Sequence, residues 1–235
     1  MFYPMYFDPT YFLVLIGVVL SLLASGRVKS TFSRYSQVRN SRGLTGAQAA
    51  EQVLHTAGIY DVRIEHVRGN LTDHYDPRSK VLRLSDSVYG QTSVAAVGVA
   101  AHECGHAIQH AKGYGPLKLR STLVPVANFG SKLAWPLIIF GLFISGESSR
   151  ILINAGIIAF LGAVLFQLIT LPVEFNASNR AIRMIADSGM MYGEEIKGAK
   201  KVLGAAALTY VASAATAILQ LLRILILTGG RRRND

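Results

Sequence analysis

The stretch His102-Glu103-Cys104-Gly105-His106 decides how the rest of this chain is interpreted. On a helix, histidines four residues apart lie one turn apart on the same face, so their ring nitrogens can meet on one metal ion, most often zinc. Glu103 lies beside the first histidine, where it can take a proton from a zinc-bound water. The motif fixes only its histidines and its glutamate and also occurs by chance in helices, so its surroundings must support it.

The residues around the motif predict a buried helix. Residues 94–101 form a small, apolar run that is compatible with a helix, and Ser93 or Thr92 can cap its start. The helix is expected to end near 112–113, at a lysine followed by a glycine. The motif is therefore expected to extend from a rigid element.

The composition indicates a membrane protein. The chain has 235 residues, of which 51% are hydrophobic and 16% charged, and the apolar residues gather in long runs. The formal net charge is +10, but the basic residues flank those runs instead of forming a nucleic-acid motif. We therefore expect anionic lipid headgroups, and no nucleic acid, as the partner of this charge. The single cysteine, Cys104, excludes an intrachain disulfide and is expected to fill a buried space.

Three apolar stretches predict membrane segments, and a fourth is ambiguous. Residues 11–25 form an uncleaved N-terminal anchor, and the basic residues after them predict an outside N-terminus and a cytosolic site. Residues 133–145 and 151–173 form a helical hairpin. Residues 202–228 either cross the membrane, leaving the arginines of the tail outside against the charge rule, or pack on the catalytic domain.

The part between the anchor and the hairpin contains the elements of a soluble domain. Residues 45–57 predict a short amphipathic helix, and residues 62–67 a strand that residues 71–75 pair with. A further alternating strand follows. It either belongs to a plain structural hairpin or holds an extended substrate backbone, through Val81, Leu82, Arg83 and Leu84.

Glu174 is the candidate third zinc ligand. It lies at the cytosolic end of the returning span, on the same side as the histidines, and two histidines with one glutamate leave a fourth position for water. The alternative is an ordinary glutamate at a helix start, stabilised by the positive end of the helix dipole. His110, one turn beyond His106, is not expected to be a ligand, because three successive turns of one straight helix cannot converge on a tetrahedral ion.

These assignments divide the chain into consecutive segments. They are an N-terminal transmembrane anchor (1–26), a cytosolic half with the motif helix (27–121), a transmembrane hairpin (122–173), a third-ligand segment (174–201), an apolar helix (202–228) and a basic tail (229–235).

Several longer motifs make the chain resemble the YugP-type neutral zinc metallopeptidases of bacterial membranes. They are Tyr-Asp-Pro-Arg at 75–78, Leu-Arg-Leu-Ser at 82–85, Ala-Ala-His-Glu-Cys-Gly-His-Ala-Ile-Gln at 100–109 and Pro-Val-Glu-Phe-Asn-Ala-Ser at 172–178. More distantly the chain is similar to the HtpX-type membrane proteases, whose third ligand lies in a Glu-Phe-x-Ala-Asp segment. Here Ser178 replaces that aspartate, so Asn176, Ser178 and His110 are candidates for supporting the ligands in another way.

The residue patterns and the resemblance together predict a mostly α-helical membrane protein with a zincin-like catalytic domain, a small β-hairpin or sheet and three to four transmembrane helices. It also implies a gluzincin-like metallopeptidase holding one Zn²⁺ per chain on His102, His106 and Glu174, with Glu103 as general base. Its partners would be a peptide or protein substrate, the lipid bilayer of the cell membrane and a membrane-protein complex. The oxyanion stabiliser stays open between Tyr210 and Tyr114.

Two other functions compete with a membrane-anchored endopeptidase. An intramembrane metalloprotease would need the motif inside the bilayer, but only a short apolar run precedes His102 and polar segments precede that run. A non-catalytic scaffold or assembly factor with a residual metal site would have no use for Glu103.

Overall fold

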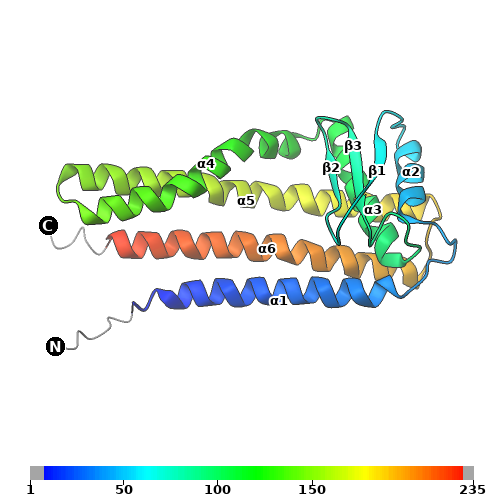
Figure 1. The fold of residues 1–235 in the computed structure, drawn as a ribbon, viewed down its shortest axis with the longest axis horizontal. Coiled ribbons are helices and arrows are strands. Elements are labelled where there is room, and N and C mark those ends of the chain that lie inside the picture. The colour runs from blue at the N-terminus through cyan, green and yellow to red at the C-terminus, as the bar shows by residue number, and fades with distance from the viewer. Residues whose placement is uncertain (1–7, 230–235) are drawn as a thin grey trace. The chain divides into compact units, whose positions relative to one another are not determined.

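The computed structural model describes residues 8–229 and is mostly helical, with one small sheet, as predicted from the sequence. Figure 1 shows the elements in chain order. They are α1 (Tyr11–Ser36), α2 (Gly46–Thr56), β1 (Arg63–Val67), β2 (His74–Asp76), β3 (Val81–Ser85), α3 (Val94–Ala111), α4 (Gly115–Phe143), α5 (Glu147–Asp187) and α6 (Glu194–Gly229). Most of the predicted basic tail, residues 230–235, lies outside the described residues.

The chain divides into two compact units. Unit 1 comprises the described residues up to 23, residues 120–169 and the described residues from 210 onward. Unit 2 comprises Ala24–Leu119 and Thr170–Thr209. The helices α1, α4, α5 and α6 each contribute residues to both units, whereas α2, α3 and the sheet belong wholly to unit 2.

Within residues 8–229, four helices are long and apolar enough to cross a membrane, by length and composition. They are α1, α4, α5 and α6. The predicted span of residues 133–145 is only part of α4, which continues through Pro125 and Pro136 as one helix. Residues 202–228 all lie in α6, so the ambiguous fourth stretch is helical over its whole length.

Within unit 1, α1 and α6 run antiparallel and in contact. Thr216 on α6 donates its hydroxyl proton to the Gly17 carbonyl of α1, at 3.2 Å. Farther along α6, the Arg223 guanidinium contacts the Asp8 carboxylate at 3.4 Å and lies 4.4 Å from the centroid of the Tyr11 ring. The start of α1 and the end of α6 are therefore at the same end of this helix pair.

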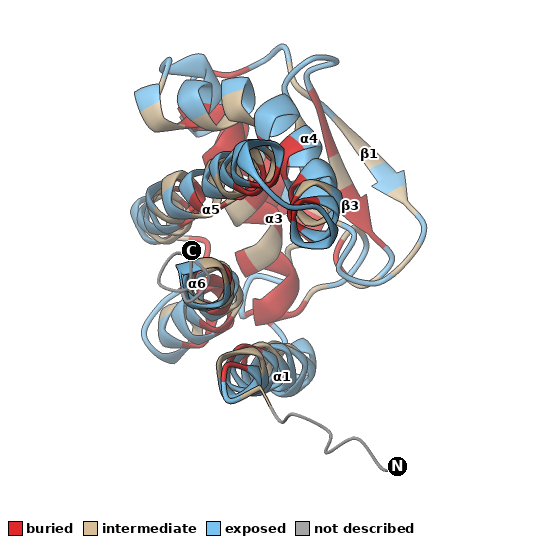
Figure 2. Ribbon diagram, turned by 90° about the vertical axis from the view of Figure 1, so that its left-hand side faces the viewer, coloured by how far each residue is buried: buried red, intermediate tan, exposed pale blue. Residues whose placement is uncertain are grey.

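The sheet of unit 2 has the order β1-β3-β2, so β3 is its central strand. β1 pairs with β3 in parallel, and β2 pairs with β3 antiparallel. The prediction that residues 71–75 pair with 62–67 was wrong. The short turn after Asp76, whose carboxylate accepts hydrogen bonds from the Arg78 amide and the Ser79 hydroxyl, joins β2 directly to β3 as a hairpin. Figure 2 shows β3 buried in red, whereas β1 is intermediate to exposed.

The core of unit 2 forms between α2, α3, β3 and the parts of α5 and α6 in this unit. Both helices, α2 and α3, start at a capping residue. Thr45 forms a capping box with Gln48, and the hydroxyl of Ser93, one of the two predicted caps of α3, accepts from the Ala96 amide. Gly105 lets α3 approach α5 closely, since a Cβ at this position would lie 2.5 Å from the Ala177 carbonyl oxygen. This close approach brings the motif of α3 to the surface of α5.

Candidate metal centre

The histidines of the motif lie on one face of α3, as their spacing predicted. The rings of His102 and His106 have centroids 4.9 Å apart and are nearly perpendicular, with an interplanar angle of 85°. The exposed fraction of the side chain is only 12% for His102 and 10% for His106. Cys104 points away from them into the core, where its thiol lies 3.5 Å from the Ala50 carbonyl oxygen, and burial raises the pKa of this thiol.

Glu174 lies in the interior of α5, not at a helix start. The helix continues through Pro172 to Asp187, so the alternative of a glutamate stabilised by a helix N-terminus was wrong. The Glu174 side chain is only 4% exposed and faces α3 across the close contact at Gly105. A carboxylate buried this deeply needs partners of opposite charge or a metal ion.

The three side chains converge on one point. Glu174 Oε2 lies 3.3 Å from His102 Nε2 and 3.5 Å from His106 Nε2. One ligand atom from each residue lies within 4.8 Å of the other two, and this is the group in the described part of the chain that is able to hold a metal ion. The structure thus brings together, from two helices, residues 68 or more positions apart in the sequence.

A glutamine that sequence reasoning missed determines the tautomer of His106. The amide nitrogen of Gln109 donates to the Val173 carbonyl at 2.8 Å and to Asn176 Oδ1 at 3.1 Å. Its Oε1 therefore accepts, and His106 Nδ1, 3.0 Å away, carries the proton. The lone pair of His106 is then on Nε2, which faces Glu174, as a metal ligand requires.

His102 has its own support from α5. His102 Nδ1 lies 3.1 Å from the Ser178 hydroxyl, so Nε2 is the nitrogen that faces Glu174. Asn176 reaches the site through Gln109 and accepts a hydrogen bond from Arg180 Nε at 2.7 Å. Ser178 and Asn176 were candidates for supporting the ligands. Ser178 contacts His102 directly, whereas Asn176 reaches His106 only through Gln109.

Glu103 contacts the sheet instead of the histidine cluster. Its Oε2 accepts a hydrogen bond from the Tyr75 amide of β2 at 3.1 Å. In an antiparallel pair, backbone groups alternate between bonding the partner strand and facing outward. Because the Tyr75 amide donates to Glu103, Tyr75 is at a position whose backbone groups face away from β3. The unpaired edge of β2 is therefore next to Glu103.

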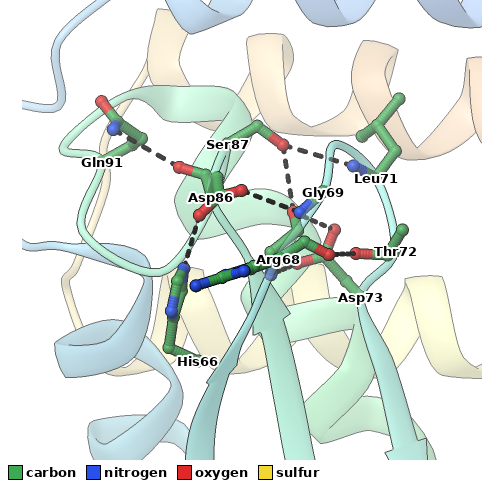
Figure 3. A network of polar contacts seen from close by, with 10 residues as sticks. His66, Arg68, Gly69, Leu71, Thr72, Asp73, Asp86, Ser87 and Gln91 are labelled. Carbon is green, nitrogen blue, oxygen red and sulfur yellow. Dashed lines mark hydrogen bonds and ion pairs between the residues drawn. The ribbon is translucent and has the colours of Figure 1, made fainter.

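A polar network fixes the loop that leads into β2 (Figure 3). The Asp86 carboxylate accepts from the Gly69 amide at 2.8 Å and contacts His66 Nε2 at 2.7 Å. Asp73 accepts from the Ser85 amide at 2.7 Å, and burial raises the pKa of the Asp73 carboxyl although this bond opposes the shift. These contacts bind residues 69–73 to the end of β3 and so hold β2 against α3.

The other candidate residues lie farther from the cluster. Val81, Leu82, Arg83 and Leu84 form the central strand, so β1 already pairs with all four, and three of their side chains are fully buried. His110 Nδ1 lies 2.9 Å from the Tyr75 hydroxyl, whose pKa burial and two nearby aspartates raise to about 12. The Arg180 guanidinium lies over the Tyr114 ring, 5.8 Å from the ring centroid. Tyr210 is on α6 in unit 1.

Comparisons with known proteins found a family and a curated relative. The family described as "Putative neutral zinc metallopeptidase" matches residues 10–229. The "Putative membrane protease YugP" of Bacillus subtilis (strain 168) is 50% identical over 224 residues, which cover 95% of this chain and 98% of the relative. No solved structure matches the chain.

Proposed function

We propose that this chain, which belongs to the family of neutral zinc metallopeptidases, is a membrane-anchored zinc-dependent endopeptidase. The family membership confirms the resemblance that the motifs indicated. The observation that carries the proposal is the convergence of His102, His106 and Glu174 on one point. The zinc, the role of each residue, the zincin-like and gluzincin-like classification and the cytosolic location are parts of the proposal.

The donor set fits zinc. Two imidazole nitrogens and one carboxylate oxygen are a common ligand set of catalytic zinc, which keeps its fourth position open. Neighbouring ligand atoms of a tetrahedral zinc site are about 3.3–3.4 Å apart, given metal–ligand distances of about 2.0–2.1 Å. The distances from Glu174 Oε2 to the two Nε2 atoms, 3.3 and 3.5 Å, agree with that spacing.

The chemistry assigns one task to each group. Bound zinc would lower the pKa of a water molecule and polarise the carbonyl of the peptide bond. Glu103 would accept the proton of that water and deliver it to the leaving amine. The Tyr75 amide orients Glu103 by donating to its Oε2, and Oε1 would accept the proton. Gln109 and Ser178 would hold the histidines in the tautomer that binds metal.

For the substrate backbone, we propose β2 in place of the predicted residues Val81 to Leu84. An extended peptide adds to a sheet only at a strand with an unpaired edge, and β3 has a neighbour on each side. β2 has one neighbour, and its outward backbone at Tyr75 adjoins Glu103. A peptide paired with β2 would lie along the general base and would bond the Tyr75 carbonyl, because the Tyr75 amide already donates to Glu103.

The helix contacts of unit 1 support four membrane crossings. Four crossings bring both ends of the chain to the same side, which agrees with the contact between Asp8 and Arg223 at the start of α1 and the end of α6. The charge of Arg223 is neutralised there by Asp8, so it is tolerated at the end of a span. α3 is not among the four candidate spans, which favours a site outside the bilayer over one inside it.

Metal removal tests the proposed activity. The full chain is purified in a mild detergent and given an unfolded protein substrate such as fluorescently labelled casein. We expect hydrolysis to stop after treatment with 1,10-phenanthroline and to return when Zn²⁺ is added. Failure of the zinc-loaded protein to cleave any of a panel of unfolded proteins and membrane peptides would contradict the peptidase and favour a scaffold with a residual metal site.

Ser178→Ala tests the support of His102. The substitution removes only the hydroxyl next to Nδ1, so we expect a zinc Kd weakened by about 10- to 100-fold with little change in stability. Ser188→Ala is the matched control, because among the described residues the Ser188 hydroxyl bonds only backbone carbonyls one turn back in its own helix. Competition with a chromophoric zinc chelator measures both values, and equal affinities would exclude a role for Ser178.

A further inference from the structure

A groove of about 410 Å³ runs between α5 and α6 on the surface of unit 2. Most of its wall is apolar and is formed by side chains such as Phe175, Ile182, Leu203 and Leu208. Phe175 and Leu208 are 45% and 47% exposed, large values for side chains of this size. An open apolar surface of this kind favours a ligand with hydrocarbon.

Two cations lie at one end of the groove, Arg183 on α5 and Lys200 on α6. None of the described residues that line the groove is acidic. Within residues 8–229, neither cation pairs with a carboxylate, in contrast to Lys197, which contacts Glu194 at 2.6 Å. Two unneutralised cations on adjacent helices are suited to a phosphate group.

The polar and apolar parts of the groove are arranged in the order that a phospholipid requires. Toward Phe175 and Leu208, both helices continue into their long apolar segments, residues 151–169 and 210–227. The cations lie at the opposite end. Arg183 is about two turns after Phe175 on α5, and Lys200 is about two turns before Leu208 on α6. A molecule with hydrocarbon toward the membrane segments and an anionic head at the other end matches this order.

We propose that the groove binds one anionic phospholipid, with its phosphate between Arg183 and Lys200 and an acyl chain along the apolar wall. The site is separate from the metal ligands, although the groove also reaches Ser178. The inference does not depend on the proposed peptidase activity, because binding of lipid is measured without a peptide substrate.

The test uses the purified full chain in neutral detergent, with palmitoyl-oleoyl phosphatidylglycerol as the probe and native mass spectrometry as the readout. The Arg183→Gln/Lys200→Gln double variant removes the two cations. Lys197→Gln/Lys201→Gln is the matched control, because it removes the same charge from α6 outside the groove. We expect the groove variant to weaken retention of the lipid by about tenfold or more and the control to change it little.

Gly204→Leu tests the apolar wall without changing any charge. Gly204 lines the groove, and a Cβ at this position meets no atom within 4 Å, so a leucine side chain projects into the groove without a backbone clash. The variant also replaces a helix-interior glycine with a better helix former, so the protein is expected to fold. We expect it to lose lipid retention as strongly as the charge variant.

Three outcomes would overturn the inference. Equal loss in both charge pairs would indicate unspecific attraction of anionic lipid to a basic protein. Unchanged retention in Gly204→Leu would exclude the groove as the place of the acyl chain. Displacement of the lipid by glycerol 3-phosphate or by a soluble acidic peptide, with the same dependence on Arg183 and Lys200, would assign the cations to a free phosphate or to a protein ligand instead.

Discussion

Glu103→Gln is expected to lower the rate of peptide hydrolysis by about 10²- to 10⁴-fold and to leave zinc bound. An amide has the size of the carboxylate but cannot take a proton from water at neutral pH. Its oxygen can still accept the hydrogen bond from the Tyr75 amide, so the local structure should persist. The expected loss corresponds to about 3–5 kcal/mol of transition-state stabilisation.

The measurement compares the hydrolysis rate and the zinc content of the same preparations. Glu51→Gln is the matched control, since Glu51 is an exposed glutamate on α2 and makes the same change of charge outside the site. Loss of activity in Glu103→Gln alone, with about one zinc per chain in both variants, would assign Glu103 to proton transfer. Activity within tenfold of the wild type would contradict the general-base role, and loss of zinc from Glu103→Gln would mean that this residue holds the metal.

The parts of the fold that the sequence predicted are governed by residues close together in the chain. The helix that carries His102 and His106 follows from the apolar run before the motif and from the cap at Ser93, all within residues 93–106. The capping box of Thr45 is equally local. Because side-chain direction follows helix geometry, the shared face of the two histidines could also be predicted.

Strand pairing and helix length were harder to predict. The strand of residues 81–85 was identified, but its central position depends on two partners, one of them parallel. The continuation of α5 through Pro172 and of α4 through two prolines contradicts the usual reading of proline as a helix end. In long apolar helices, packing and the lack of competing water preserve the helix where a single sequence predicts a break.

The residues that support the site include one that could have been predicted from the sequence and one that could not. Gln109 could have been found, because it lies three residues after His106 on the same helix, where side chains meet. Tyr75 could not, since its backbone amide, not its side chain, contacts Glu103, and a backbone contact leaves no mark on residue type. Ser178 was identified only as a departure from the related motif.

Glu174→Ala is expected to lower the zinc content from about one per chain to nearly none at micromolar protein, as is His106→Ala. Glu174 contributes the only carboxylate within reach of both Nε2 atoms in the described part of the chain, and it is almost completely buried. Without it, two imidazoles from adjacent turns of one helix would have to hold the ion alone. Loss of one ligand of three removes both charge neutralisation and a fixed coordination position.

The variants should also lose stabilisation by zinc. A ligand present at about 1,000 times its Kd stabilises the folded state by about 4 kcal/mol, so added zinc should raise the Tm of the wild type but not of Glu174→Ala or His106→Ala. Glu147→Ala, at the exposed start of the same helix, is the control and should respond to zinc like the wild type. Glu174→Gln keeps the size of the side chain and so separates packing from ligation. If Glu174→Gln bound zinc as tightly as the wild type, or if only His106→Ala lost it, Glu174 would not be a ligand, and the third ligand would have to be sought elsewhere in the chain.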